Sequence, residues 1–136
     1  HPDQKEVAGR LLAKEGTKER GSISCFVQYY TKPEYLCTIN RRSFYPVPDV
    51  DSALLRLKIL DKPEIDVKDE AAFFKIIRGA FNQRRKSIIN SLSREAVLDM
   101  PKSKLTSLLA SLGIDPASRP EDMPLSSFAL IANSIG

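Results

Sequence analysis

Phe44 and Tyr45 form an aromatic pair that follows two arginines, Arg41 and Arg42, in the sequence. An aromatic ring offers a flat apolar surface to a ligand, and a guanidinium offers a fork of N–H donors. Either ring could therefore be presented to a ligand, and Arg41 and Arg42 beside them are candidate contacts. The alternative for Phe44 is structural, with its ring packed under the edge of a sheet.

Two prolines make the loop around these rings stiff. Pro46 and Pro48 fix their own φ angles and push the residues before them toward extended conformations. Residues 44–48 are therefore expected to form an extended loop. Such a loop can hold a ring in a fixed orientation without an ordering cost when a ligand binds.

A second group of candidate residues is a basic run that contains no acid. Between Ala71 and Arg94 the sequence holds six basic residues and neither Asp nor Glu. Such a run indicates a polyanionic partner, although a solvated helix face gives the same pattern. The candidate residues of this run for contact with such a partner are Lys75, Arg78, Arg84, Arg85 and Lys86.

Placing the basic run on a helix separates its cations. Phe73, Ile77 and Phe81 fall on one apolar arc, whereas most of the cations fall on the flank or the opposite side. Arg84 falls inside the apolar arc. An isolated buried charge is too costly, so this guanidinium must be paired or lie at an exposed edge. Arg84 is therefore interpreted either as a structural clamp or as a contact with the polyanionic partner.

The elements that must position these residues change character near residue 62. Before it, we expect helices at Gln4–Ala13 and at Ser22–Tyr29, the second with Ser22 or Ser24 as its N-cap. Two strands that suit antiparallel pairing follow at 35–39 and 50–60.

From Lys68 onward the pattern is wholly helical. Helices are expected at about 69–92 and 94–98, from Pro101 to a glycine C′ position at Gly113, and at 124–134. The last of these should face inward through Phe128, Ile131, Ala132 and Ile135. The predicted fold class is α+β: helices and an antiparallel strand pair at residues 1–62, then a mainly α-helical carboxy-terminal domain at residues 68–136.

The composition fits a soluble intracellular protein. The 136 residues are 42% hydrophobic, which is enough for a core, and the net charge is +4. No apolar run approaches the roughly 18 residues of a membrane span, and we predict no membrane contact. Cys25 and Cys37 have no His or Cys neighbours at metal-ligand spacing, so no metal site is predicted. Both are expected to be buried or half-buried apolar residues.

Several stretches, in chain order, resemble the ribosomal RNA adenine dimethyltransferases. They are QKEVAGRLLAK, GSISCFVQYY, SFYPVPDVDSALLRL and AFNQRRKSIINSL, with LGIDPASRPEDMPLSSFALIAN closing the chain. Members of this family use S-adenosylmethionine to dimethylate adenines in small-subunit ribosomal RNA. The resemblance implies a cytoplasmic parent enzyme whose cofactor is S-adenosylmethionine and whose partner is small-subunit ribosomal RNA in the small ribosomal subunit.

The resemblance also assigns roles along the chain. It implies that residues 1–62 are the remnant of a Rossmann-like methyltransferase domain and that residues 68–136 form a helical RNA-binding domain. Carried over residue by residue, stacking on the target adenine falls on Phe44, with Tyr45 in support. One departure weakens contact between this loop and phosphate, because Asp49 stands where the family commonly has Lys, and Arg41 and Arg42 are the candidates that restore it. The resemblance makes RNA the partner of these two arginines and of Lys75, Arg78, Arg84, Arg85 and Lys86.

Three family motifs do not occur in this sequence: the Gly-rich cofactor turn, the acidic residue that ends the second strand, and the Asn-Leu-Pro-Tyr loop. We therefore expect a carboxy-terminal piece with a truncation point at residues 1–3. We also expect no catalytic residue in this chain, no cofactor bound by it alone, and no activity without the other half.

Two other classes of function remain open. The first is a non-catalytic helical nucleic-acid-binding module, since the helix, the Gly113 turn and the next helix loosely resemble a helix-turn-helix. The second is a purely structural domain whose basic helix keeps it soluble. Drug-resistance methyltransferases acting on large-subunit RNA share the family's fold. The QRRK helix and the LGIDP segment favour the small-subunit enzyme.

Overall fold

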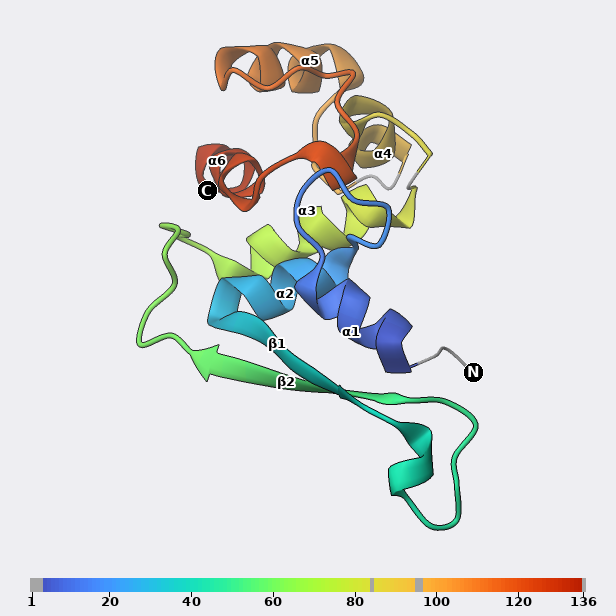
Figure 1. Ribbon diagram of the computed structural model, residues 1–136. Coiled ribbons are helices and arrows are strands. Elements are labelled where there is room, and N and C mark those ends of the chain that lie inside the picture. Colours follow the sequence, from blue (N-terminus) through green and yellow to red (C-terminus); the bar gives the residue numbers. More distant parts are fainter. Residues whose placement is uncertain (1–3, 84, 95–96, 136) are drawn as a thin grey trace. The chain divides into compact units, whose positions relative to one another are not determined.

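The computed structural model describes residues 4–83, 85–94 and 97–135, and these form an α+β fold (Figure 1). Within these ranges there are six α-helices and one two-stranded antiparallel sheet. The chain divides into two compact units. Unit 1 takes the residues up to Lys14 and 19–63, and unit 2 takes 15–18 and the residues from Glu64 onward.

Unit 1 is a β-hairpin with two helices packed on it (Figure 1). Its elements in chain order are α1 (Gln4–Leu12), α2 (Ser22–Tyr30), β1 (Thr31–Ile39), the 3₁₀ turn η1 (Arg41–Ser43) and β2 (Ser52–Ile59). Side-chain bonds fix α2 to the end of α1. The Ser24 hydroxyl donates to the Arg10 carbonyl, and Gln28 Nε2 donates to the Ala13 carbonyl at 2.6 Å.

The start of α2 differs in detail from the prediction. The N-cap is Gly21, whose backbone N–H donates to the Ser24 hydroxyl at 3.1 Å. Ser24, the third residue of the helix, thus accepts the hydrogen bond of the N-cap N–H, as the N3 residue of a capping box does. The prediction of a helix here is confirmed, and the prediction of Ser22 or Ser24 as its N-cap is wrong.

The antiparallel pairing of the two strands is confirmed. Thr31 lies opposite Ile59 at one end and Ile39 opposite Ser52 at the other, with a register shift between Tyr35 and Cys37. β1 begins at Thr31 rather than Tyr35. Residues 31–34 lack the apolar alternation of a half-buried strand, which is why the pattern did not predict them.

Unit 2 is a helical bundle around an apolar core. Its elements are α3 (Glu70–Asn82), α4 (Ile88–Arg94), α5 (Lys102–Ser111), the 3₁₀ turn η2 (Pro120–Asp122) and α6 (Leu125–Ile135). Asp69 caps α3, since its Oδ1 accepts from Ala72 N at 3.2 Å. α3 packs on α6, where the Phe81 and Phe128 ring centroids lie 6.1 Å apart. The fully buried side chains of this core include Phe73, Ile76, Ile77, Ile88, Leu92, Leu105, Leu109, Phe128 and Ile131.

The continuous helix predicted at about 69–92 is wrong, because it breaks into α3 and α4. The backbone N–H of Ile88 donates to the Ser118 carbonyl at 2.7 Å, and that of Ile89 donates to the Pro116 carbonyl at 3.2 Å. In an unbroken helix these donors would pair four residues back along the chain. Contacts with a distant loop therefore take the place of these two helical hydrogen bonds.

Gly113 ends α5 as predicted. It has φ +75°, its N–H donates to the Ala110 carbonyl at 3.0 Å, and the N–H of Ile114 donates to the Leu109 carbonyl at 2.9 Å. This pair of bonds is a Schellman motif, which needs a left-handed C′ residue. The next α-helix begins only at Leu125. The spacing does not match the three- or four-residue turn of a helix-turn-helix, so that comparison is wrong.

Three smaller predictions also need correction. α4 ends at Arg94, and residues 97 and 98 are not helical, so the helix predicted at 94–98 is wrong. Ile135 is 36% exposed, although Phe128, Ile131 and Ala132 face inward as predicted. Cys25 is buried as expected, but Cys37 is exposed.

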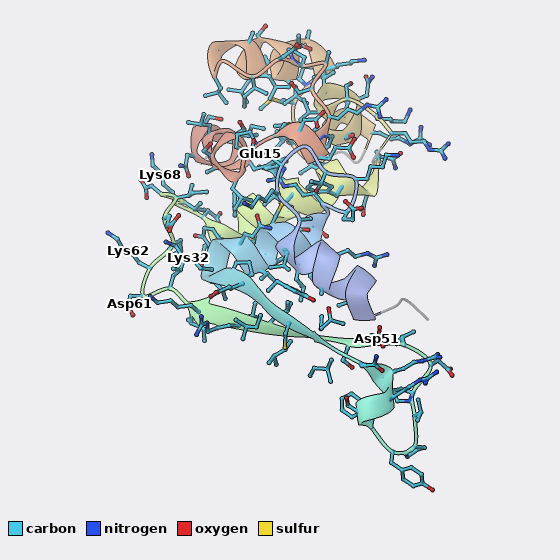
Figure 2. All side chains as sticks on the ribbon, in the orientation of Figure 1. Glu15, Lys32, Asp51, Asp61, Lys62 and Lys68 are labelled. Atoms are coloured by element: carbon cyan, nitrogen blue, oxygen red, sulfur yellow. The ribbon has the colours of Figure 1, made fainter. Side chains whose placement is uncertain are left out.

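Three tertiary hydrogen bonds involve segments of unit 2 outside its helices. Asn133 holds the segment before α3, because its Oδ1 accepts from Lys68 N at 2.9 Å and its Nδ2 donates to the Asp66 carbonyl at 2.8 Å. The loop that begins at Glu15 (labelled in Figure 2) joins the same unit, where Gly16 N donates to the Glu121 carbonyl at 2.7 Å.

Among the described residues, no helix combines the length and the apolar character needed to cross a lipid bilayer.

Candidate nucleic-acid interface

The proline loop between β1 and β2 is held by hydrogen bonds at both of its ends. The Asn40 side chain accepts from Arg42 N at 2.8 Å, and the Asn40 carbonyl accepts from Ser43 N at 3.0 Å. Asp51, at the β2 end (Figure 2), accepts from Arg41 N through Oδ1 at 2.7 Å. These bonds close the loop across its base. The Tyr45–Pro46 peptide bond is cis.

The apolar side chains of this loop are exposed. The exposed fraction is 43% for Phe44, 99% for Tyr45 and 53% for Val47. Arg41 and Arg42 are exposed as well, and Arg41 Nη1 donates to the Asp49 carbonyl at 3.4 Å. Unit 1 therefore presents two rings and two guanidinium groups within one short loop. Such a surface can stack on bases and bind phosphate.

A second candidate surface lies on unit 2. Lys75 and Arg78 are exposed on α3, where the spacing of three residues puts them on one face. Arg85 and Lys86 are exposed in the turn that separates α3 from α4. Lys86 N donates to the Gln83 carbonyl at 2.9 Å, which shapes that turn. The remaining candidate, Arg84, lies outside the described residues.

The structure adds Arg119 to this surface. Because the Ser118 carbonyl accepts from Ile88 N, the backbone of Arg119 lies beside the turn that carries Arg85 and Lys86. The Arg119 side chain is exposed. No sequence pattern points to Arg119, since it stands 33 positions beyond Lys86 in a segment of mixed charge. We call Arg85, Lys86 and Arg119 the basic cluster.

A further polar contact joins α4 to α5. Lys102 Nζ donates to Asn90 Oδ1 at 2.7 Å. A neutral amide leaves the positive charge of the lysine uncompensated. Asp99, however, lines the same cleft as Lys102, so this end of unit 2 is less basic than the cluster.

The cleft between α1 and the hairpin of unit 1 does not fit S-adenosylmethionine. The cleft of unit 1 has a volume of about 320 Å³ and is lined by Ala8, Gly9, Leu12, Tyr35, Thr38 and Ala53. None of these six carries a carboxylate for the ribose hydroxyls, and they form no Gly-rich turn of the kind that the dinucleotide-binding fold uses. Over the same described ranges, no cluster of three or more His, Cys, Asp or Glu residues could hold a metal ion.

Comparison with sequence families gives a match over nearly the whole chain. A family model described as ribosomal RNA adenine dimethylase matches residues 3–136. The chain is 45% identical over 134 residues to a Bacillus cytotoxicus protein named ribosomal RNA small subunit methyltransferase A. It is 46% identical over 134 residues to the protein of that name from Bacillus mycoides. Each alignment covers 97% of this chain and 46% of the relative, so the chain spans about half the length of these curated relatives.

Two solved structures are similar in fold. A dimethyladenosine transferase from Plasmodium falciparum matches with a TM-score of 0.82 and 22% identity, over 96% of this chain and 54% of that chain. The 23S rRNA methyltransferase ErmE matches with a TM-score of 0.61 and 19% identity, over 97% and 52%. At these identities the likeness shows a shared fold alone. The family model covers residues 3–136, and the chain therefore belongs to the ribosomal RNA adenine dimethylase family.

Proposed function

We propose that this chain is the RNA-docking portion of a cytoplasmic methyltransferase that uses S-adenosylmethionine to dimethylate adenines of small-subunit ribosomal RNA. Family membership supports the reaction, and the relatives that share 45% and 46% identity carry small-subunit methyltransferase in their names. The observation that carries the docking role is the basic cluster. It joins two segments far apart in sequence, and one of them belongs to a run of six cations without an acid.

In this proposal the two units have different tasks. Unit 2 is a helical RNA-binding domain, in which Lys75 and Arg78 extend the contact of the basic cluster along α3. Phosphate contacts of this kind fix the position of a protein on RNA without reading sequence. Unit 1 is the end of a Rossmann-like methyltransferase domain, and its proline loop supplies one wall of the target-base pocket. Phe44 is the ring that stacks on the target adenine.

The chain alone is expected to transfer no methyl group. The Gly-rich turn and the Asn-Leu-Pro-Tyr segment that the resemblance places in the catalytic half do not occur in it. Incubation with radiolabelled S-adenosylmethionine and unmethylated small ribosomal subunits checks this. Labelled RNA would show that the chain holds a complete catalytic site.

The docking role is tested by RNA binding at several salt concentrations. The ligand is the 3′-terminal hairpin of small-subunit ribosomal RNA, and the variant replaces Arg85, Lys86 and Arg119 by Ala. Each lost phosphate contact should reduce the slope of log K against log salt by about 0.7 to 0.9, so the triple variant should lose about 2 to 3 units of slope.

A matched control removes the same charge from other places. Lys58, Lys62 and Lys104 are exposed and lie outside the basic cluster, so replacing all three by Ala also lowers the net charge by three. We expect this control to keep most of the slope. Equal losses in both variants would show that net charge, rather than the cluster, governs binding. A preference for duplex DNA would favour a general nucleic-acid-binding module. A preference for a large-subunit hairpin would indicate that the substrate is large-subunit ribosomal RNA.

A further inference from the structure

The side chain of Tyr45 stands apart from the protein surface. It is 99% exposed, whereas Phe44 beside it is 43% exposed. A single exposed apolar residue is ordinary, but here three neighbours, Phe44, Tyr45 and Val47, are exposed together. A tyrosine ring has a large apolar surface, which favours burial against a partner. The tip of the proline loop thus has the composition of a contact site.

The backbone at Phe44 is extended, with φ −113° and ψ 152°. Successive side chains of an extended chain point in opposite directions, so this geometry favours different directions for the rings of Phe44 and Tyr45. The two rings also differ in exposure, at 43% and 99%. A base that stacks on Phe44 is therefore not expected to stack on Tyr45 as well, which leaves Tyr45 to a second ligand.

The chemistry around Tyr45 identifies that second ligand. Arg41 and Arg42 lie in the same loop as one exposed acidic residue, Asp49, whereas Asp51 is turned toward the backbone N–H of Arg41. The two cations outnumber the exposed acidic residue. Aromatic rings next to cations are the combination that binds single-stranded nucleic acid, since every base has a face and every nucleotide a phosphate. The loop is also held at its base by the bonds of Asn40 and Asp51, so little conformational entropy is lost when a ligand binds.

We infer that Tyr45 stacks on an RNA base that flanks the target adenine, and that it thereby holds the strand from which the target is taken. This inference rests on the proposed function and assigns Tyr45 to a nucleotide other than the one bound by Phe44. Tyr45 is a positioning residue in this role. It keeps the neighbouring base in place while the target occupies its pocket.

The sequence contains no tryptophan, which gives a direct test. Tyr45→Trp places a single fluorophore at the tip, and Val47→Trp, two residues away and 53% exposed in the parent chain, is the matched control. Both variants are titrated with the hairpin RNA. We expect strong quenching at position 45, where the indole stacks on a base, and weak quenching at position 47. Equal quenching at both positions would overturn the inference.

Alanine variants separate the two rings. The same RNA is made with 2-aminopurine either at the target position or at a flanking position. Tyr45→Ala should remove the fluorescence change at the flanking position and weaken binding by about 5- to 100-fold, as expected for one lost stacking contact. Phe44→Ala should affect the target position instead. Tyr45→Phe should restore binding, since it keeps the ring.

The outcomes distinguish this inference from the proposed function. If Tyr45→Ala binds like the unsubstituted chain while the basic-cluster variant loses salt dependence, docking stands and the role of Tyr45 is wrong. If the unsubstituted chain does not bind the hairpin, both are wrong. Because Tyr45 is almost fully exposed, its substitution should leave the thermal unfolding midpoint unchanged. A lowered midpoint would show that the Tyr45 ring packs against the protein, and it would also overturn the inference.

Discussion

Cys25 lies fully buried in unit 1, and this burial raises the pKa of its thiol to about 11, while the charge of Arg20 acts in the opposite direction. The ordinary value for a cysteine on the same scale is 9.0. Between these values the folded chain holds the thiol proton and the unfolded chain releases it. The resulting stabilisation is fully present below pH 9 and is lost as the pH rises toward 11.

We predict a steeper loss of stability at alkaline pH for the unsubstituted chain than for Cys25→Ala. The difference between the two free energies of unfolding should change by roughly 2 to 3 kcal/mol between pH 8 and pH 11. Urea denaturation under reducing conditions measures this difference, and the comparison with the variant cancels the contributions that both chains share. Parallel curves would show that the thiol is not desolvated in the folded chain.

The candidate residues differ in how far the sequence could find them. Composition and order are enough to identify Phe44, Arg85 and Lys86, because rings near prolines and cations without acids are visible in one dimension. Arg119 depends on a backbone hydrogen bond between Ser118 and Ile88, and no local pattern records that bond. The RNA-binding and stacking roles of these residues remain predictions.

At the scale of elements, two glycines should respond in opposite ways to the same substitution. Gly113 has φ +75°, where a Cβ is unfavourable, and Gly113→Ala should destabilise the chain by about 1 to 2 kcal/mol. Gly9 lies inside α1, and a Cβ added there meets no atom within 4 Å. Gly9→Ala should therefore stabilise the chain by about 0.5 to 1 kcal/mol.

Urea denaturation of the two variants provides the measurement, with each serving as the control for the other. A loss of stability in Gly9→Ala would mean that α1 does not form as a regular helix. A neutral Gly113→Ala would mean that the Schellman motif can rearrange at little cost.

The helices and strands illustrate which signals are local. The C-terminal end of α5 and the strand pairing were predicted correctly, because a glycine C′ position and period-two alternation are properties of neighbouring residues. The break between α3 and α4 was missed. Residues 83–87 contain no proline or glycine, and the break follows from the bonds of Ile88 and Ile89 to the carbonyls of Ser118 and Pro116. Tertiary contacts of this kind override local helix propensity.

At the scale of the whole molecule, the core is divided unequally between the units. Most of the fully buried large side chains belong to unit 2, whereas both strands of the hairpin carry exposed apolar residues such as Leu36, Leu54 and Ile59. Regions with few buried contacts open at lower free energy. We expect amide hydrogen exchange to be fastest in β1 and β2 and slowest in α3.

A core substitution tests whether the two units unfold separately. Phe128 is fully buried in unit 2, and Phe128→Ala should lower the stability of that unit by about 3 to 5 kcal/mol. Leu130→Ala, on the exposed side of the same helix, is the matched control and should have little effect. Hydrogen exchange by mass spectrometry reports on each unit. If Phe128→Ala accelerates exchange equally in the hairpin and in α3, the chain unfolds as one cooperative body instead.

The route of the chain between the units bears on how such proteins can be recombined. The polypeptide enters unit 2 at residue 15, leaves it after residue 18, and returns at residue 64. A gene segment encoding residues 64–136 would therefore carry less than one unit, and the Glu121 carbonyl would lose its Gly16 partner. Exchange of the helical part between relatives would preserve this bond only if the short loop after α1 were exchanged with it. In a functional chimaera, residues 15–18 and 64–136 should thus come from the same relative.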